Sequence, residues 1–196
     1  MGDLPGIGHN RGPALAGSGF RAHCWGVARR ELLGATLPVE VVRMQVRRAR
    51  ALGLDYKTYA GVRAVTGRDL VAFLYSSNGI GVFRSTQAPA GHVLARIAAS
   101  AAQPHLGTAP GIAPDIAGAR INARSARPLA PFGASWAAMR DEMKGWLHAQ
   151  GLPGNAVLMI GETDHERELM TAGGLAGFVT GQTHFGPQLA GAADAV

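Results

Sequence analysis

The sequence predicts an α/β protein in which a helical N-terminal region is followed by a small parallel sheet flanked by helices. Residues 70–75 and 156–160 are short continuous apolar runs, and each leads into a turn-forming segment, which is typical of strands buried on both faces. The second run is followed by a helical segment and by a third short run, residues 176–180. This strand–helix–strand order indicates two parallel strands joined by a crossover helix.

Composition places limits on the class of protein. The chain has 196 residues, of which 47% are hydrophobic, so a sizeable core is expected. Its single cysteine, Cys24, excludes an internal disulfide and favours a reducing compartment. No apolar run approaches the roughly 18–20 residues that a membrane span needs, and the first residues do not resemble a signal peptide. We therefore expect a cytoplasmic protein without a membrane span.

Positive charge is concentrated in the first third of the chain. The formal net charge is +6, and residues 1–70 hold 11 Lys+Arg against 5 Asp+Glu, so all of the excess lies there. This asymmetry favours a nucleic acid or another acidic surface as a partner. Arginine-rich helices are also common in proteins from GC-rich genomes, and that interpretation needs no such partner.

The chain is expected to divide into four segments. Residues 1–19 are glycine-rich and predict a flexible tail; within them, residues 6–13 resemble a short N-terminal motif of many uncharacterised alphaproteobacterial proteins. Residues 20–66 predict a basic helical region with helices at 20–34, 38–52 and 55–65, the last capped by Asp55 and ended by Gly67. Residues 67–185 form the predicted α/β unit, and residues 186–196 a second flexible tail.

Within the α/β unit, two helices are predicted between the strands. Residues 88–101 form the first, and Ser135 caps the second, in which Trp136 and Trp146 are expected to face the core. Residues 103–133 hold several prolines and glycines and are expected to be mostly loop.

The motif with the strongest chemical character spans residues 151–181. A buried strand ends before Glu162, a second acid, Glu166, follows four residues later, and a helix, an Ala-Gly turn and another strand come next. Carboxylates at the carboxyl end of a strand suit a hard cation such as Mg²⁺. Thr163 and Glu166 also match a capping box, which stabilises a helix start without any metal.

This segment resembles the last conserved motif of the haloacid dehalogenase-like hydrolases, over about residues 145–182. In that superfamily a strand ends in Gly-Asp, and this acid and a second one four residues later help to hold Mg²⁺. The resemblance implies that Glu162 and Glu166 are metal ligands. It also implies that Ser76 or Ser77, after another strand, contacts a phosphorylated ligand, and that Lys144 takes the place of the family's lysine.

The chain departs from the superfamily at its nucleophile. That residue is an aspartate in an Asp-x-Asp pattern after an early strand, and the sequence offers neither the pattern nor such a strand. The resemblance therefore implies a degenerate domain that binds Mg²⁺ or a phosphorylated small molecule. As an enzyme it would be a phosphatase-like hydrolase, but covalent phosphoryl transfer has no evident carrier.

Residues 38–66 support a different hypothesis, a nucleic-acid-binding helix-turn-helix. Ala49 and Gly53 have the spacing of the small residue and the turn glycine in such a unit. Arg48 and Tyr59 stand where apolar residues are commoner. Two helices joined at a glycine are also frequent in ordinary helical packing, and a basic amphipathic helix can dock on a protein or an anionic membrane. The residues expected to contact nucleic acid are Arg43, Arg47, Arg50, Lys57 and Arg63.

Overall fold

The computed structural model describes residues 37–186. The chain divides into two compact units, residues 1–42 and 43–196, and of the first unit only residues 37–42 are described, which include the first four residues of helix α2. Three predicted segments lie outside the described residues: the tail at 1–19 with its glycine-rich motif, the helix at 20–34 with Cys24, and nearly all of the tail at 186–196.

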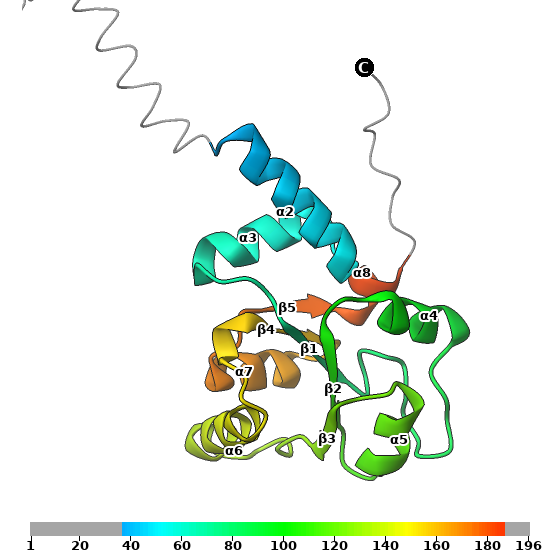
Figure 1. Cartoon of the computed structure of the whole chain (residues 1–196). Coiled ribbons are helices and arrows are strands. Elements are labelled where there is room, and N and C mark those ends of the chain that lie inside the picture. Colours follow the sequence, from blue (N-terminus) through cyan, green and yellow to red (C-terminus); the bar gives the residue numbers. More distant parts are fainter. Residues whose placement is uncertain (1–36, 187–196) are drawn as a thin grey trace, which may run out of the picture. The chain divides into compact units, whose positions relative to one another are not determined.

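The second unit is α/β, as predicted, and contains a five-stranded parallel sheet (Figure 1). None of the helices in the described part of the chain is long and apolar enough to cross a membrane. In chain order the elements are α2 (Val39–Leu52), α3 (Tyr56–Thr66), β1 (Ala72–Ser76), α4 (Gly91–Ala99), β2 (Gln103–Thr108), α5 (Pro114–Arg120), β3 (Ser125–Pro128), α6 (Trp136–Ala149), the 3₁₀ turn η1 (Gly154–Ala156), β4 (Val157–Gly161), α7 (Asp164–Gly173), β5 (Gly177–Thr180) and α8 (Gly181–Phe185).

The strand order is β3-β2-β1-β4-β5, so the chain winds outward from β1 in one direction and then returns to continue from β4 in the other. All neighbouring strands are parallel, and their carboxyl ends therefore lie along one edge. The register brings the end of β1 beside the end of β2, with Ser76 opposite Gly107, while Tyr75 lies opposite Ile160 of β4. The reversal of direction between β1 and β4 is a topological switch point.

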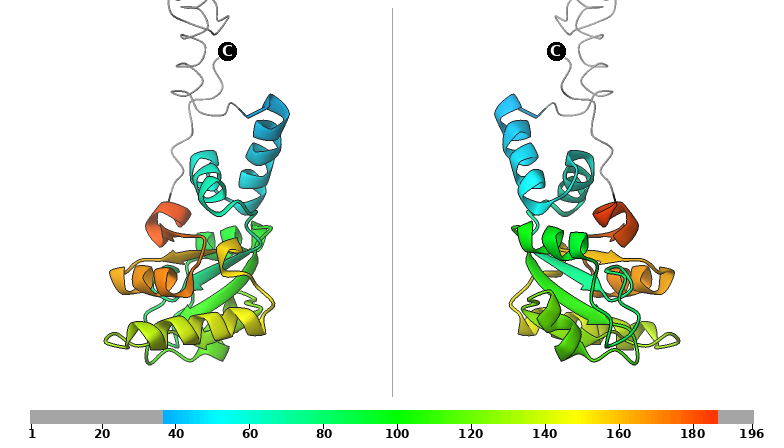
Figure 2. Two further views of the ribbon diagram at one scale, coloured as in Figure 1. Left: turned by 90° about the vertical axis from the view of Figure 1, so that its left-hand side faces the viewer. Right: turned by 90° about the vertical axis from the view of Figure 1, so that its right-hand side faces the viewer.

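Two apolar clusters cover the two faces of the sheet and make a three-layer structure (Figures 1 and 2). Alternate residues of β1 point to opposite faces, as the two-residue period of a strand requires. Phe73 and Tyr75 pack in the first cluster, with residues from α2 to α5 and α8. Ala72 and Leu74 pack in the second, with residues from α6 and α7. The sheet is thus buried on both faces, which explains the continuous apolar runs in its central strands.

Helices α2 and α3 confirm the two helices predicted between residues 38 and 65. The side chain of Asp55 accepts a hydrogen bond from the backbone N–H of Thr58 at 2.9 Å, so it caps α3. Gly67 ends α3 with φ at +66°, a left-handed conformation that favours glycine. The strands at 72–76, 157–161 and 177–180 and the helix beginning at Trp136 also confirm their predictions.

The expectation of a loop over residues 103–133 was wrong, because β2, α5 and β3 lie within it. Three of its five prolines lie at or near the ends of these elements, and the other two, Pro110 and Pro131, lie in loops. Pro104 lies just before His105, where β2 begins to pair with β3. Pro114 is the first residue of α5, and Pro128 is the last residue of the edge strand β3. A missing backbone N–H costs little at such positions.

Trp136 also differs from its prediction. It lies in the first turn of α6 and is 51% exposed, whereas Trp146, as expected, is buried. The indole N–H of Trp146 donates a hydrogen bond to Ser125 at 2.8 Å, which joins α6 to β3.

Candidate functional site

The loops that follow β1 and β4 meet at the switch point, where ligands bind in open parallel sheets. Ser76 is the last residue of β1, and Ser77 and Asn78 follow it in the loop, while Glu162 and Thr163 lie between β4 and α7. Here a hydrogen bond joins Asn78 to Glu166, which lies 88 residues further along the sequence.

Glu166 is the centre of this contact. Its side chain is buried, and one carboxylate oxygen, Oε2, accepts the backbone N–H groups of Glu162 at 2.7 Å and Thr163 at 2.9 Å. The other oxygen, Oε1, accepts from the Nδ2 amide of Asn78 at 3.0 Å. Because an ionised carboxylate only accepts hydrogen bonds, the amide nitrogen of Asn78 must be the atom that faces it. The Thr163 hydroxyl accepts from the backbone N–H of Glu166, which completes the capping box.

The arrangement fits a resident Mg²⁺ poorly. Mg²⁺ takes oxygen ligands in an octahedron, but N–H donors occupy both oxygens of Glu166. Glu162 is exposed, and one of its oxygens lies 3.3 Å from the backbone N–H of Gln182. Among residues 37–186, no three His, Cys, Asp or Glu side chains are grouped so that they could hold a metal ion. Magnesium binding by Glu162 and Glu166 remains a prediction.

Ser76 and Ser77, predicted to contact a ligand, lie at the expected edge of the sheet but are fully buried. The Ser76 hydroxyl oxygen accepts the backbone N–H of Gly79 at 2.9 Å, which closes the turn after β1. The Ser77 hydroxyl oxygen accepts the backbone N–H of Ala109 at 2.9 Å, which joins the loops after β1 and β2. Both serines therefore shape the loops that form the site.

Lys144 lies on the exposed side of α6, and it lines neither of the two cavities that adjoin Asn78. Two residues of the segment 103–133, which was expected to be loop, lie at strand ends on the same edge of the sheet. Thr108 ends β2 and is fully buried, and its hydroxyl has no hydrogen-bond partner among the described residues. Arg127 is exposed near the end of β3, in register with Gly107. Sequence reasoning missed both because the strands that carry them were not predicted.

The two cavities open on either side of Asn78, which lines both of them. The first has a volume of about 490 Å³ and is formed by the loop after β1, the start of α4 and α8, with Glu162 at its wall. The second, of about 440 Å³, is formed by the loops after β1, β2, β3 and β4 and has a largely apolar lining that includes Phe132. His165 also lines it, and its Nε2 lies 2.8 Å from the backbone oxygen of Ala130.

Glycines allow these loops to approach one another. A Cβ atom on Gly79 would lie 2.6 Å from the backbone oxygen of Ile160, and one on Gly181 would overlap the backbone oxygen of Gly79. A Cβ on Gly161 would lie 2.8 Å from Oε2 of Glu166. At Gly79 and Gly181 the backbone of the loop after β1 thus packs against the backbone of the end of β4 and of the start of α8, and only glycine fits at these two contacts.

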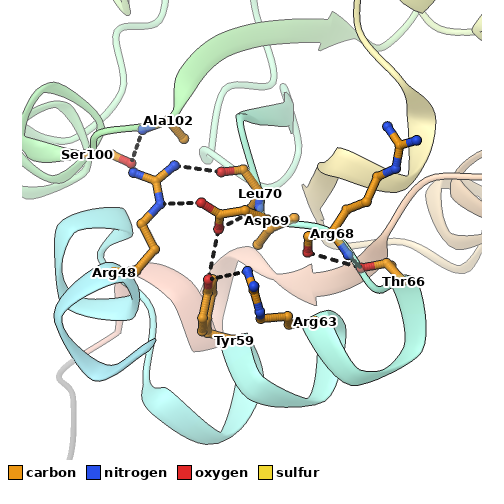
Figure 3. A network of polar contacts seen from close by, with 9 residues as sticks. All are labelled: Arg48, Tyr59, Arg63, Thr66, Arg68, Asp69, Leu70, Ser100 and Ala102. Atoms are coloured by element: carbon orange, nitrogen blue, oxygen red, sulfur yellow. Dashed lines mark hydrogen bonds and ion pairs between the residues drawn. The ribbon is translucent and has the colours of Figure 1, made fainter. Parts of the chain in front are cut away.

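The region predicted as a helix-turn-helix is fastened to the sheet by polar contacts (Figure 3). Arg48 donates to the carboxylate of Asp69 at 2.9 Å and to the backbone oxygen of Leu70 at 2.8 Å, and the hydroxyl of Tyr59 donates to the same carboxylate at 2.8 Å. The two residues that depart from the helix-turn-helix pattern, Arg48 and Tyr59, therefore connect α2 and α3 to the start of β1.

The residues predicted to contact nucleic acid divide into two groups. Arg63 is partly buried and donates to the hydroxyl of Tyr59 at 3.3 Å, so it belongs to the polar contacts around Asp69. The others are exposed on α2 and α3: Arg43, Arg47, Arg50 and Lys57.

Comparisons of the chain with known protein families, with characterised proteins and with solved structures found no match. The class of protein is therefore defined by the fold alone. It is a three-layer parallel α/β domain whose switch point carries a buried carboxylate, an amide and two cavities.

Proposed function

We propose that the α/β unit is a degenerate haloacid dehalogenase-like domain that binds a phosphorylated small molecule at the carboxyl edge of its sheet without covalent phosphoryl transfer. The proposal includes a cytoplasmic location, which the single cysteine favours.

The order of the strands supports the resemblance to the haloacid dehalogenase-like hydrolases outside the C-terminal motif as well. β1 is the first strand of the described chain and lies at the centre of the sheet, next to β4. Its end carries Ser76 and Asn78, which have the spacing of the superfamily's Asp-x-Asp pattern. A hydroxyl and an amide would then replace the two carboxylates. Neither group is ionised at neutral pH, so we expect no phosphoaspartate chemistry at this strand end.

The observation that carries the proposal is the buried hydroxyl of Thr108, which has no hydrogen-bond partner within residues 37–186. Burying a hydroxyl without a partner costs about 1–3 kcal/mol, so such a group calls for an explanation. Thr108 ends the strand beside β1, where the superfamily places a Ser or Thr that contacts the phosphoryl group, a role that Ser76 or Ser77 was expected to fill. The next residue, Ala109, lines the second cavity. Arg127 supplies a cation at the same edge.

A thermal-shift titration with inorganic phosphate in EDTA tests this proposal, with Thr108→Val as the matched variant. Valine has nearly the shape of threonine and removes an unpaired hydroxyl, so we expect the variant to be at least as stable as wild type. Phosphate at tenfold excess over its Kd should raise the Tm of wild type by about 3 °C or more, and should raise that of the variant less. An equal response in both proteins, or none in wild type, would count against the proposal.

Nucleic-acid binding through residues 38–66 is the second candidate function. The observation in its favour is that Arg43, Arg47 and Arg50 are all exposed along α2, and Lys57 is exposed on α3. Neutralisation of phosphates by these residues predicts an affinity that falls steeply with salt. Fluorescence anisotropy with a labelled duplex tests this, because Arg47→Ala should then reduce both the affinity and its dependence on salt.

A further inference from the structure

We infer that the side-chain amide of Asn78 takes the place of a divalent cation between the loops after β1 and β4, so that the domain closes its switch point without metal. The inference concerns the site of the proposed function, but it does not require that a ligand binds there. It rests on the hydrogen bonds of Glu166 and on its burial.

The buried carboxylate of Glu166 needs partners, and the structure supplies three N–H donors. Two come from the backbone just before α7: the N–H of Thr163 belongs to the capping box, and the N–H of Glu162 binds the same oxygen from one residue earlier. The third comes from Asn78, on a different strand end, and points at the oxygen that the capping box leaves free. An amide N–H in this position presents positive partial charge to the carboxylate, as a bound cation would.

A comparison with an aspartate at position 78 shows what the amide of Asn78 contributes to the contact with Glu166. Two carboxylates about 3 Å apart repel each other, and they coexist only if they share a proton or bind a cation. A carboxylate and an amide instead form a hydrogen bond whose donor is uncharged, so they need neither a shared proton nor a cation. Replacing Asn78 by aspartate should therefore convert a metal-independent contact into one that depends on a cation.

Thermal unfolding of wild type, Asn78→Asp and the double variant Asn78→Asp/Glu166→Gln tests this inference. Each is measured in EDTA and in increasing Mg²⁺ or Ca²⁺, at constant ionic strength. We expect wild type to have the same Tm in every solution. The single variant should lose about 5 °C or more in EDTA and recover saturably with the cation. The double variant exchanges amide and carboxylate across the contact and keeps the capping box, since glutamine also serves there. It should regain stability and lose the response to cation.

Three outcomes would overturn the inference. The first is a saturable stabilisation of wild type by Mg²⁺ that Glu166→Gln abolishes, because the cation would then bind despite the amide. The second is a folded Asn78→Asp variant whose Tm is equal in EDTA and in cation. The third is a double variant that does not recover stability. Phosphate is absent from all of these solutions, so a failure of phosphate binding would leave the result unchanged.

Discussion

Arg48 and Asp69 form an ion pair at 2.9 Å that joins helix α2 to the residues leading into β1 (Figure 3). The same carboxylate also accepts hydrogen bonds from the hydroxyl of Tyr59 and the backbone N–H of Leu70. One side chain therefore holds α2, α3 and the start of the central strand together. Arg48 therefore has a structural role within the domain. Any contact between α2 and nucleic acid would involve the exposed residues of this helix.

Asp69→Asn should destabilise the domain by about 1–2 kcal/mol. The asparagine keeps the shape but loses the charge and one acceptor, while partial exposure of the ion pair to solvent limits the loss. Urea unfolding measures the change. Asp141→Asn is the control, because its ion pair with Arg140 lies on the exposed surface of α6 and should contribute nothing measurable. Equal effects of the two substitutions would contradict a structural role for Asp69.

Gly79→Ala should destabilise the domain by about 1–3 kcal/mol, because the new Cβ would meet the backbone of Ile160 and Gly161, which cannot move aside as a side chain can. Gly145→Ala offers a matched comparison. That glycine lies inside α6, and no atom of a neighbouring element lies within 4 Å of the place that the methyl group would take, so alanine should stabilise the helix by up to about 1 kcal/mol. Thermal or urea unfolding should therefore give opposite signs for the two variants. A neutral Gly79→Ala would show that the loops are not closely packed.

The buried His184 should make stability depend on pH. It packs among Phe73, Tyr75 and Phe185, and burial, aided by the positive charge of Arg96, lowers its pKa from 6.5 to about 4. The folded state therefore holds the imidazole neutral, while the unfolded chain takes up a proton below about pH 6.5. Stability from this residue is fully present above that pH and is lost progressively down to about pH 4, by roughly 3 kcal/mol.

The measurement for His184 is the Tm from pH 7 to pH 4 in wild type and His184→Phe. Phenylalanine does not titrate and suits the aromatic surroundings, so the variant should lose less stability as the pH falls. His105, whose pKa burial also lowers, should account for part of the slope that remains. Parallel curves for the two proteins would contradict the assignment to His184.

Local signals in the sequence predicted much of the fold. Asp55 and Gly67 mark the ends of α3. The apolar runs at 70–75 and 156–160 overlap β1 and β4, because a strand buried on both faces has no polar alternation. The segment 103–133 could not be interpreted in the same way. Its prolines are usual signs of loops, and only the structure shows that Pro104, Pro114 and Pro128 lie at or near the ends of elements.

The candidate site was predicted in outline and not in its contacts. Position along the chain was enough to bring Ser76, Ser77, Glu162 and Glu166 to one edge of the sheet. Asn78 was not predicted because a single amide after a strand is ordinary in a turn, and its partner lies 88 residues away. Thr108 was not predicted because its strand was not. Such pairings depend on strand order, which no local pattern in the sequence encodes.

The measurement that tests the central claim most directly is a titration of ¹⁵N-labelled wild type with inorganic phosphate in EDTA, followed by NMR. The account predicts saturable shifts of amide signals at the strand ends, above all those of Asn78, Thr108 and Ala109, with smaller effects on α2 and α3. Thr108→Val should abolish or strongly weaken them. Shifts confined to the basic residues of α2, or no saturable shift at the strand ends, would contradict the claim that this edge is a phosphate-binding site.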